Sequence, residues 1–116
     1  MSFRGTKDRV KQTSITTGTG NLTFSGTSTG SVSFSSVYST NDLFDVGIYA
    51  TDGSAWEICL AQLVSSTVLA RILVYSNSLG TTAFINFTVS TIIYCDLPAI
   101  KINVTYANNF SPGAYW

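Results

Sequence analysis

The stretch DVGIYATDGSAWEICL, residues 45–60, decides the fold class. Apolar side chains alternate with other residues before and after the segment Thr51–Ser54, and alternation with a period of two is typical of β-strands. The Asp52-Gly53 pair between the two alternating runs is typical of a hairpin turn. In the second run, Trp56, Ile58 and Leu60 share one face of the expected strand, opposite Glu57 and Cys59. The stretch therefore predicts an antiparallel β-hairpin.

Similar short stretches recur on both sides of this hairpin, separated by Gly, Asn, Ser and Asp. The run Val68–Tyr75 is apolar on both faces apart from Arg71, which predicts a central strand that is covered on each side. The other expected strands lie around Leu22–Phe24, Val32–Phe34, Thr81–Phe87, Thr91–Cys95 and Ile100–Tyr106. Because helical periodicity is absent, the sequence predicts an all-β, single-domain antiparallel β-sandwich or barrel of about eight strands with an extended N-terminal arm.

The composition indicates a protein that associates with others and excludes several kinds of catalytic site. Charged residues make up 10% of the 116 residues and the net charge is zero, whereas an average soluble domain is about 25% charged. Such a surface does little to oppose association. The chain has no His, which excludes Ser-His-Asp and Cys-His sites and His-ligated metals. No cofactor is expected, and no basic stripe indicates nucleic-acid binding.

The compartment is inferred from the N-terminal segment and the cysteines. No apolar segment follows the charged first residues, so no signal peptide is expected, and no apolar run approaches the roughly 20 residues that span a bilayer. The chain is therefore expected to be synthesised in the cytosol. In that compartment Cys59 and Cys95 are expected to be reduced, buried thiols, with a disulfide as the alternative.

The two ends of the chain differ from its middle. Residues 1–11 are predicted to be a basic arm, residues 12–106 the β-domain and residues 107–116 an aromatic tail. The arm contains four cations and one acid, Asp8, so it suits an acidic surface, although a frayed terminus is the alternative. The tail either folds back on the domain or is buried in a neighbour. The candidate interface residues are Arg4, Lys7, Arg9, Lys11, Phe110, Tyr115 and Trp116.

The carboxylates are the only remaining candidates for acid–base catalysis, and their positions favour structural roles. Asp42 and Asp45 flank Leu43-Phe44 at an expected corner between a turn and a strand, and Asp52 begins the hairpin turn. Glu57 is predicted to form a cross-strand ion pair with Arg71. No catalytic site is therefore expected, and the protein is predicted not to be an enzyme. The tyrosines and tryptophans leave glycan binding open as an alternative.

Several stretches together resemble a small β-structured module of tailed-bacteriophage virion proteins. The similar segments, in order, are Asp8–Thr13 leading into Thr16–Gly20, Gly30 followed by Ser33-Phe34, Trp56-Glu57-Ile58, Leu69-Ala70-Arg71 before Val74–Asn77, and Asp96–Ala99. The resemblance covers roughly residues 8–101. Cys59 and Ala61 depart from it, since glycines are expected there.

The resemblance implies a non-enzymatic structural protein of the virion. A single small domain suits a capsid decoration (cement) protein that binds the major capsid protein and stabilises the shell. The alternatives are a tail adaptor or fibre-associated module that binds a tail protein, and a carbohydrate-binding module for host adhesion. Low charge and the expected free edge strands predict a homotrimer. No membrane or nucleic-acid partner is expected.

Overall fold

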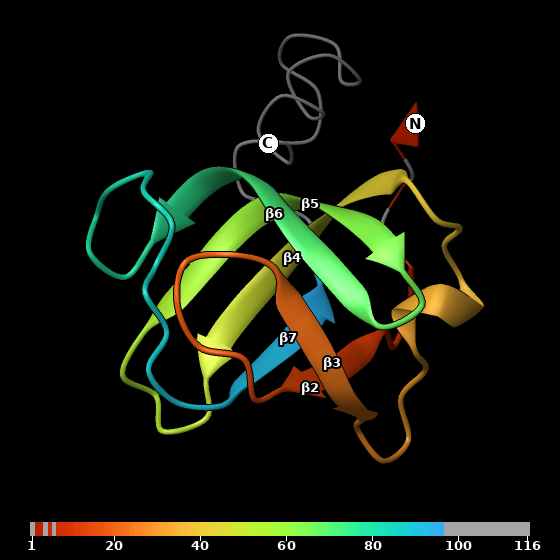
Figure 1. The fold of residues 1–116 in the computed structure, drawn as a ribbon, viewed down its shortest axis with the longest axis horizontal. Helices are drawn as coiled ribbons and strands as arrows, with labels where there is room; N and C mark the ends of the chain where they lie inside the picture. Colours follow the sequence, from red (N-terminus) through yellow and green to blue (C-terminus); the bar gives the residue numbers. More distant parts are fainter. Residues whose placement is uncertain (1, 4, 6, 97–116) are drawn as a thin grey trace, which may run out of the picture.

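A computed structural model describes residues 2, 3, 5 and 7–96, which fold into a closed antiparallel barrel (Figure 1). Its strands and its single short helix are β1 (Ser2–Phe3), β2 (Lys11–Ser14), β3 (Leu22–Thr27), the 3-10 helix η1 (Phe34–Ser36), β4 (Asp42–Ala50), β5 (Trp56–Ser65), β6 (Val68–Asn77) and β7 (Thr91–Cys95). The predicted all-β class is confirmed, and a barrel is formed. The strand expected at Ile100–Tyr106 lies outside the described residues.

The barrel closes because β7 pairs with both β2 and β4. The strand order is β1-β4-β5-β6-β3-β2-β7, and the additional β4–β7 pairing joins the ends of this order into a ring of six antiparallel strands. The short β1 lies outside the ring and pairs in parallel with the start of β4. The predicted hairpin is present as β4 and β5, and Gly53 takes a positive φ of 78° in its turn.

The join between β3 and β6 is short and β6 is irregular. These two strands share only the register pairs Leu22↔Leu69 and Thr23↔Val68. Farther along β6, Arg71 is opposite Ala61 and Leu73 is opposite Leu60 on β5, so Ile72 is an extra residue in a β-bulge. The bulge leaves both Ile72 and Leu73 about half exposed, at 45% and 54%. The prediction that this strand is covered on both faces is therefore wrong.

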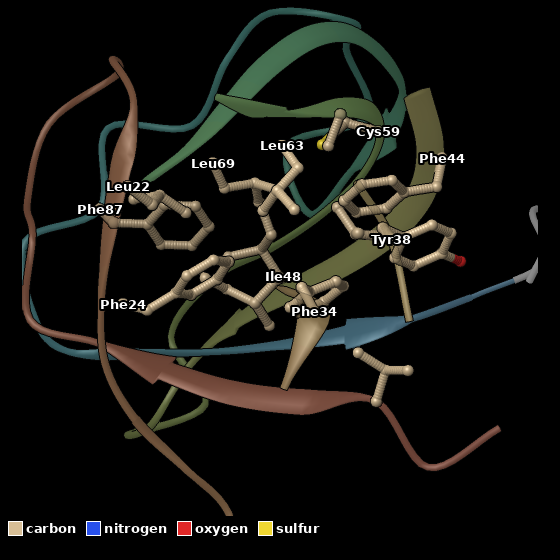
Figure 2. Close-up of a cluster of buried hydrophobic side chains, with 14 of the residues drawn as sticks. Leu22, Phe24, Phe34, Tyr38, Phe44, Ile48, Cys59, Leu63, Leu69 and Phe87 are labelled. Atoms are coloured by element: carbon tan, nitrogen blue, oxygen red, sulfur yellow. The ribbon is translucent and has the colours of Figure 1, made fainter. Parts of the chain in front are cut away.

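The core is built around stacked aromatic rings (Figure 2). Phe34 is fully buried and stacks on Phe24 and Phe44, with both ring centroids 5.3 Å away. Tyr38 packs against Phe44 at 4.0 Å. Phe34 begins η1, so the strand expected at Val32–Phe34 is replaced by a helical turn that carries an aromatic side chain into the barrel.

Two further segments differ from the sequence predictions. Residues 81–87 form a loop, not a strand, and they touch the barrel through an isolated bridge between Gly18 and Phe87. At the N-terminus, β2 begins at Lys11 and Val10 is a core residue, 2% exposed. The predicted boundary between arm and domain therefore falls inside β2, and the end of the predicted arm is part of the barrel.

Candidate functional site

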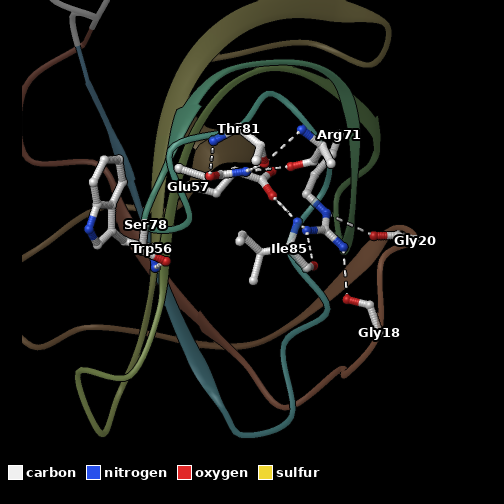
Figure 3. A network of polar contacts seen from close by, with 10 residues as sticks. Gly18, Gly20, Trp56, Glu57, Arg71, Ser78, Thr81 and Ile85 are labelled. Carbon is white, nitrogen blue, oxygen red and sulfur yellow. Dashed lines mark hydrogen bonds and ion pairs between the residues drawn. The ribbon is translucent and has the colours of Figure 1, made fainter.

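A buried ion pair between Glu57 and Arg71 lies inside one end of the barrel (Figure 3). Nη1 of Arg71 lies 3.0 Å from Oε1 of Glu57, and the two side chains are 1% and 0% exposed. The pair predicted from the sequence is therefore present. It forms through the interior, because Arg71 is opposite Ala61 in the sheet register and its long side chain extends along the barrel towards Glu57.

The inward position of Glu57 reverses the pattern expected for β5. The inward face consists of Glu57, Cys59, Ala61 and Leu63, while Trp56 lies outside and is 42% exposed. Sequence alternation identifies two faces but not which one is buried, and the more polar face is the inner one here. Arg71 also faces inwards, so each buried charge has its counter-ion.

Arg71 joins two loops to the sheet. Its Nε donates to the carbonyl oxygen of Gly20 and its Nη2 to that of Gly18, at 3.1 and 2.9 Å. Nη1 also donates to the carbonyl of Ile85 at 3.0 Å, and the Ile85 N–H donates to Glu57. The guanidinium group therefore holds the segments around residues 18–20 and 85 over this end of the barrel. The role of the ion pair and its hydrogen bonds is therefore structural, because they fix two loops to the sheet.

The contacts of Cys59, Cys95 and Asp52 indicate structural roles for these side chains. Cys59 and Cys95 are free; Cys59 is buried as expected, and Cys95 is partly buried beside the Tyr38 hydroxyl. Burial raises the pKa of the Cys59 thiol, and Glu57 raises it further. Asp52 accepts a hydrogen bond from the Ser54 N–H in the hairpin turn, as predicted, and the Ser54 hydroxyl together with this N–H lowers the pKa of the Asp52 carboxyl.

The described residues contain no group of three or more His, Cys, Asp or Glu side chains placed to hold a metal ion. None of their helices is long and apolar enough to cross a membrane.

A second feature is a groove of about 560 Å³ on the outside of the barrel. It lies over β2, β7 and β4, beside the loop between β3 and η1. It combines two cations, two tyrosines and three hydroxyl-bearing residues with Val10 and Cys95; the lining residues are Arg9, Val10, Lys11, Ser28, Thr29, Ser31, Tyr49, Tyr94 and Cys95.

The tyrosine side of the groove depends on a missing side chain at Gly47. Gly47 on β4 is opposite Tyr94 on β7, and a Cβ atom added to Gly47 would overlap the Tyr94 ring. The ring therefore lies across the β4 backbone. Tyr49, two residues farther along β4, stands beside it with the ring centroids 5.8 Å apart and the planes at 58°. Burial raises the pKa of the Tyr94 phenol, and Asp96 and Tyr49 raise it further.

The cationic side of the groove is fixed by a corner between Arg9 and Gly30. Arg9 Nε donates to the Gly30 carbonyl at 2.8 Å, and backbone hydrogen bonds join Val32 to both Arg9 and Lys11. Both corner residues have positive φ, 58° for Arg9 and 79° for Gly30, a conformation that is uncommon for a residue with a side chain. This backbone geometry directs the guanidinium group to the groove.

The structure brings together only part of the predicted interface set. Arg9 and Lys11 line the groove, and Lys7 is exposed near it, with its N–H 3.3 Å from Cys95 Sγ. Arg4, Phe110, Tyr115 and Trp116 lie outside the described residues. Sequence reasoning missed Tyr49 and Tyr94 as a surface pair, because their contact depends on the register between β4 and β7. Gly47, which interrupts the apolar alternation of residues 46–50, was the one local sign that another group lies close to this backbone.

Gly47→Ala is expected to displace the Tyr94 ring and to lower the free energy of unfolding by about 1–3 kcal/mol, the usual effect of overpacking. Urea titration measures the loss, and the Tyr94 ring signals in NMR spectra report the displacement. Gly26→Ala on β3 is the matched control, because a Cβ atom there meets only Thr13 Oγ1, at 3.4 Å. In a Tyr94→Ala background the Gly47→Ala loss should largely disappear. An equal loss in both backgrounds would contradict the proposed overlap.

Comparison of the chain with protein-family models, curated proteins and solved structures found no match.

Proposed function

We propose that this chain is a non-enzymatic structural protein of a tailed-bacteriophage virion, a capsid decoration protein that assembles with copies of itself on the shell. The observation that carries the proposal is the uncharged, partly apolar outer surface of β5, β6 and the loop that follows β6. The resemblance of residues 8–101 to a phage virion module supports the virion context.

Residues 53–95 include only two charged residues, Glu57 and Arg71, and both are buried against each other. The surface of β5, β6 and the loop that follows therefore has no charged side chain. Most of the large exposed apolar residues of the described chain also lie there: Trp56, Val64, Ile72, Leu73, Leu79 and Phe84. Ile72 and Leu73 are adjacent at the bulge, and exposed apolar side chains that lie together are typical of interaction sites.

A second copy of the chain suits this surface because identical faces meet without repulsion between like charges. In a cyclic oligomer each copy presents the same residues near the axis, so an uncharged face brings no like charges together there. Because the barrel is closed, most of the edge strands that were expected to be free are paired. Among the described strands, β6 beyond Leu69 is paired with β5 alone, so the edge beside Ile72 and Leu73 has no second strand partner.

Sedimentation velocity of the full chain should give a species of three times 12.5 kDa at micromolar concentrations. Leu73→Lys places a charge on each copy of the half-exposed face and is expected to shift the protein to monomers, while thermal unfolding stays close to that of the parent. Thr27→Lys on the exposed part of β3 is the matched control and should leave the oligomer intact. A parent protein that stays monomeric at every concentration would overturn self-assembly through this face.

Cryo-electron microscopy of virions, with copy counting by mass spectrometry, tests the location. Copies at the threefold positions of the capsid support a decoration protein. A few copies at the tail vertex would replace that proposal with a tail adaptor, and absence from the virion would overturn both.

A further inference from the structure

The geometry of the outer groove points to a binding site for an acidic saccharide, one that carries carboxylate groups. This assignment is independent of the proposed assembly, because it uses β2, β4 and β7, whereas the uncharged face uses β5 and β6. The site consists of the Tyr49–Tyr94 pair, the cations Arg9 and Lys11, and the hydroxyls of residues 28, 29 and 31.

The groove collects hydrogen-bonding groups that the described chain leaves unused. The backbones of Ser28 and Ser31 are engaged in the turn, but within the described residues no hydrogen bond is made by the side-chain hydroxyls of Ser28, Thr29 or Ser31. The same holds for the phenol groups of Tyr49 and Tyr94. A saccharide presents many hydroxyls in a small volume, so a wall of unused hydroxyls matches its chemistry.

The tyrosines supply the apolar part of the site. Tyr94 lies across the backbone at Gly47 and Tyr49 stands beside it at 58°. One ring can therefore stack against the C–H face of a sugar while the other borders its edge. The volume of about 560 Å³ lies within the range of small-molecule sites, with room for a short oligosaccharide.

The charge of the groove favours an acidic ligand. Arg9 uses Nε for Gly30, and its two terminal nitrogens make no other hydrogen bond among the described residues. Arginine binds carboxylates with this planar edge. No carboxylate is among the described lining residues, although Asp8 adjoins Arg9 and the charge of Asp96 acts on Tyr94. A ligand carboxylate would therefore meet two cations in the groove, and no described lining residue carries a carboxylate that would compete for them.

A single-stranded nucleic acid is the less favoured ligand. A strand-binding groove follows several phosphates with a series of cations and offers successive stacking faces. This groove has two cations, and its two rings meet at a steep angle rather than in line.

The test begins with an array of uronate- and sialate-bearing oligosaccharides beside matched neutral ones, probed with the full chain. Binding confined to the acidic set is expected. Titration calorimetry then compares the strongest ligand with its carboxyl methyl ester, and the ester is expected to bind at least tenfold more weakly. An octathymidylate is titrated in parallel.

Two variants locate the site. Tyr94→Ala should remove binding, and Arg9→Gln/Lys11→Gln should weaken binding of the acid at least tenfold while leaving the ester unchanged. Both cations are on the surface, so the double variant keeps the assignment testable if Tyr94→Ala fails to fold. Trp56→Leu, an exposed aromatic outside the groove, is the matched control and should bind like the parent. The assignment is overturned by no binding to any acidic glycan, by equal binding of acid and ester, or by tighter binding of octathymidylate.

Discussion

Arg71→Met is expected to lower the free energy of unfolding by about 3–5 kcal/mol, the usual effect of removing one partner of a buried ion pair. Glu57 is 0% exposed and would keep only the N–H of Ile85 as a donor. Its second oxygen, Oε2, already has no hydrogen-bond partner in the described structure. The Gly20 carbonyl oxygen would also lose its Arg71 donor, and that of Gly18 would keep only the Phe87 N–H, so the segment that carries them would be held less firmly at the barrel end.

Urea titrations of Arg71→Met, Glu57→Leu and the double variant measure this effect. The double variant should be more stable than Arg71→Met, because a buried pair can be replaced by apolar residues of similar size with little loss. Arg71→Lys should recover only part of the stability, since a lysine ammonium lacks the planar set of donors that reaches three carbonyl groups and Glu57. If the free energy of unfolding of Arg71→Met lies within about 1 kcal/mol of the parent value, the ion pair does not hold the two loops to the barrel.

Phe34→Ala is expected to lower the free energy of unfolding by about 3–5 kcal/mol, the range observed for large-to-small changes at buried aromatics. The ring is fully buried and stacks on Phe24 and Phe44. It enters the barrel from η1, a single 3-10 turn that is not part of the sheet. The Phe34 N–H also donates to the buried side chain of Gln12 at 2.7 Å, so the variant should loosen this turn as well.

Chemical denaturation followed by near-ultraviolet circular dichroism checks this expectation. Phe34→Leu keeps most of the apolar volume and should lose clearly less than Phe34→Ala. Phe84→Ala is the matched control at a 40% exposed ring, with an expected loss below about 1 kcal/mol. Equal losses at the two phenylalanines would contradict the central position of Phe34 in the core.

The sequence was sufficient for the features that depend on neighbouring residues. The β4–β5 hairpin follows from alternation and from Asp52-Gly53, both local signals. The Glu57–Arg71 pair could be predicted because the two residues lie on successive expected strands, from which the long Arg71 side chain can reach Glu57.

Features that depend on register could not be predicted in the same way. The bulge at Ile72 shifts the alternation of β6, so Arg71 turns inwards while Ile72 and Leu73 turn out. The apolar run 81–87 has the composition of a strand but forms a loop, because neighbouring barrel strands already pair with one another. The groove joins Gly47 to Tyr94 across 47 positions, and no local pattern specifies that contact.

The closure of the barrel through β7 also constrains how the chain reaches its fold. The β4–β5–β6 meander contains contacts between neighbouring segments and can form as soon as it is synthesised. Lys11 of β2, by contrast, pairs with Tyr94 of β7, which lies 83 residues later in the chain. Such distant pairings are slow because the intervening chain must be ordered first. Because β7 pairs with both β2 and β4, the ring stays open on the side of its aromatic core until this last strand is added, and its closure is expected to be a late step in folding.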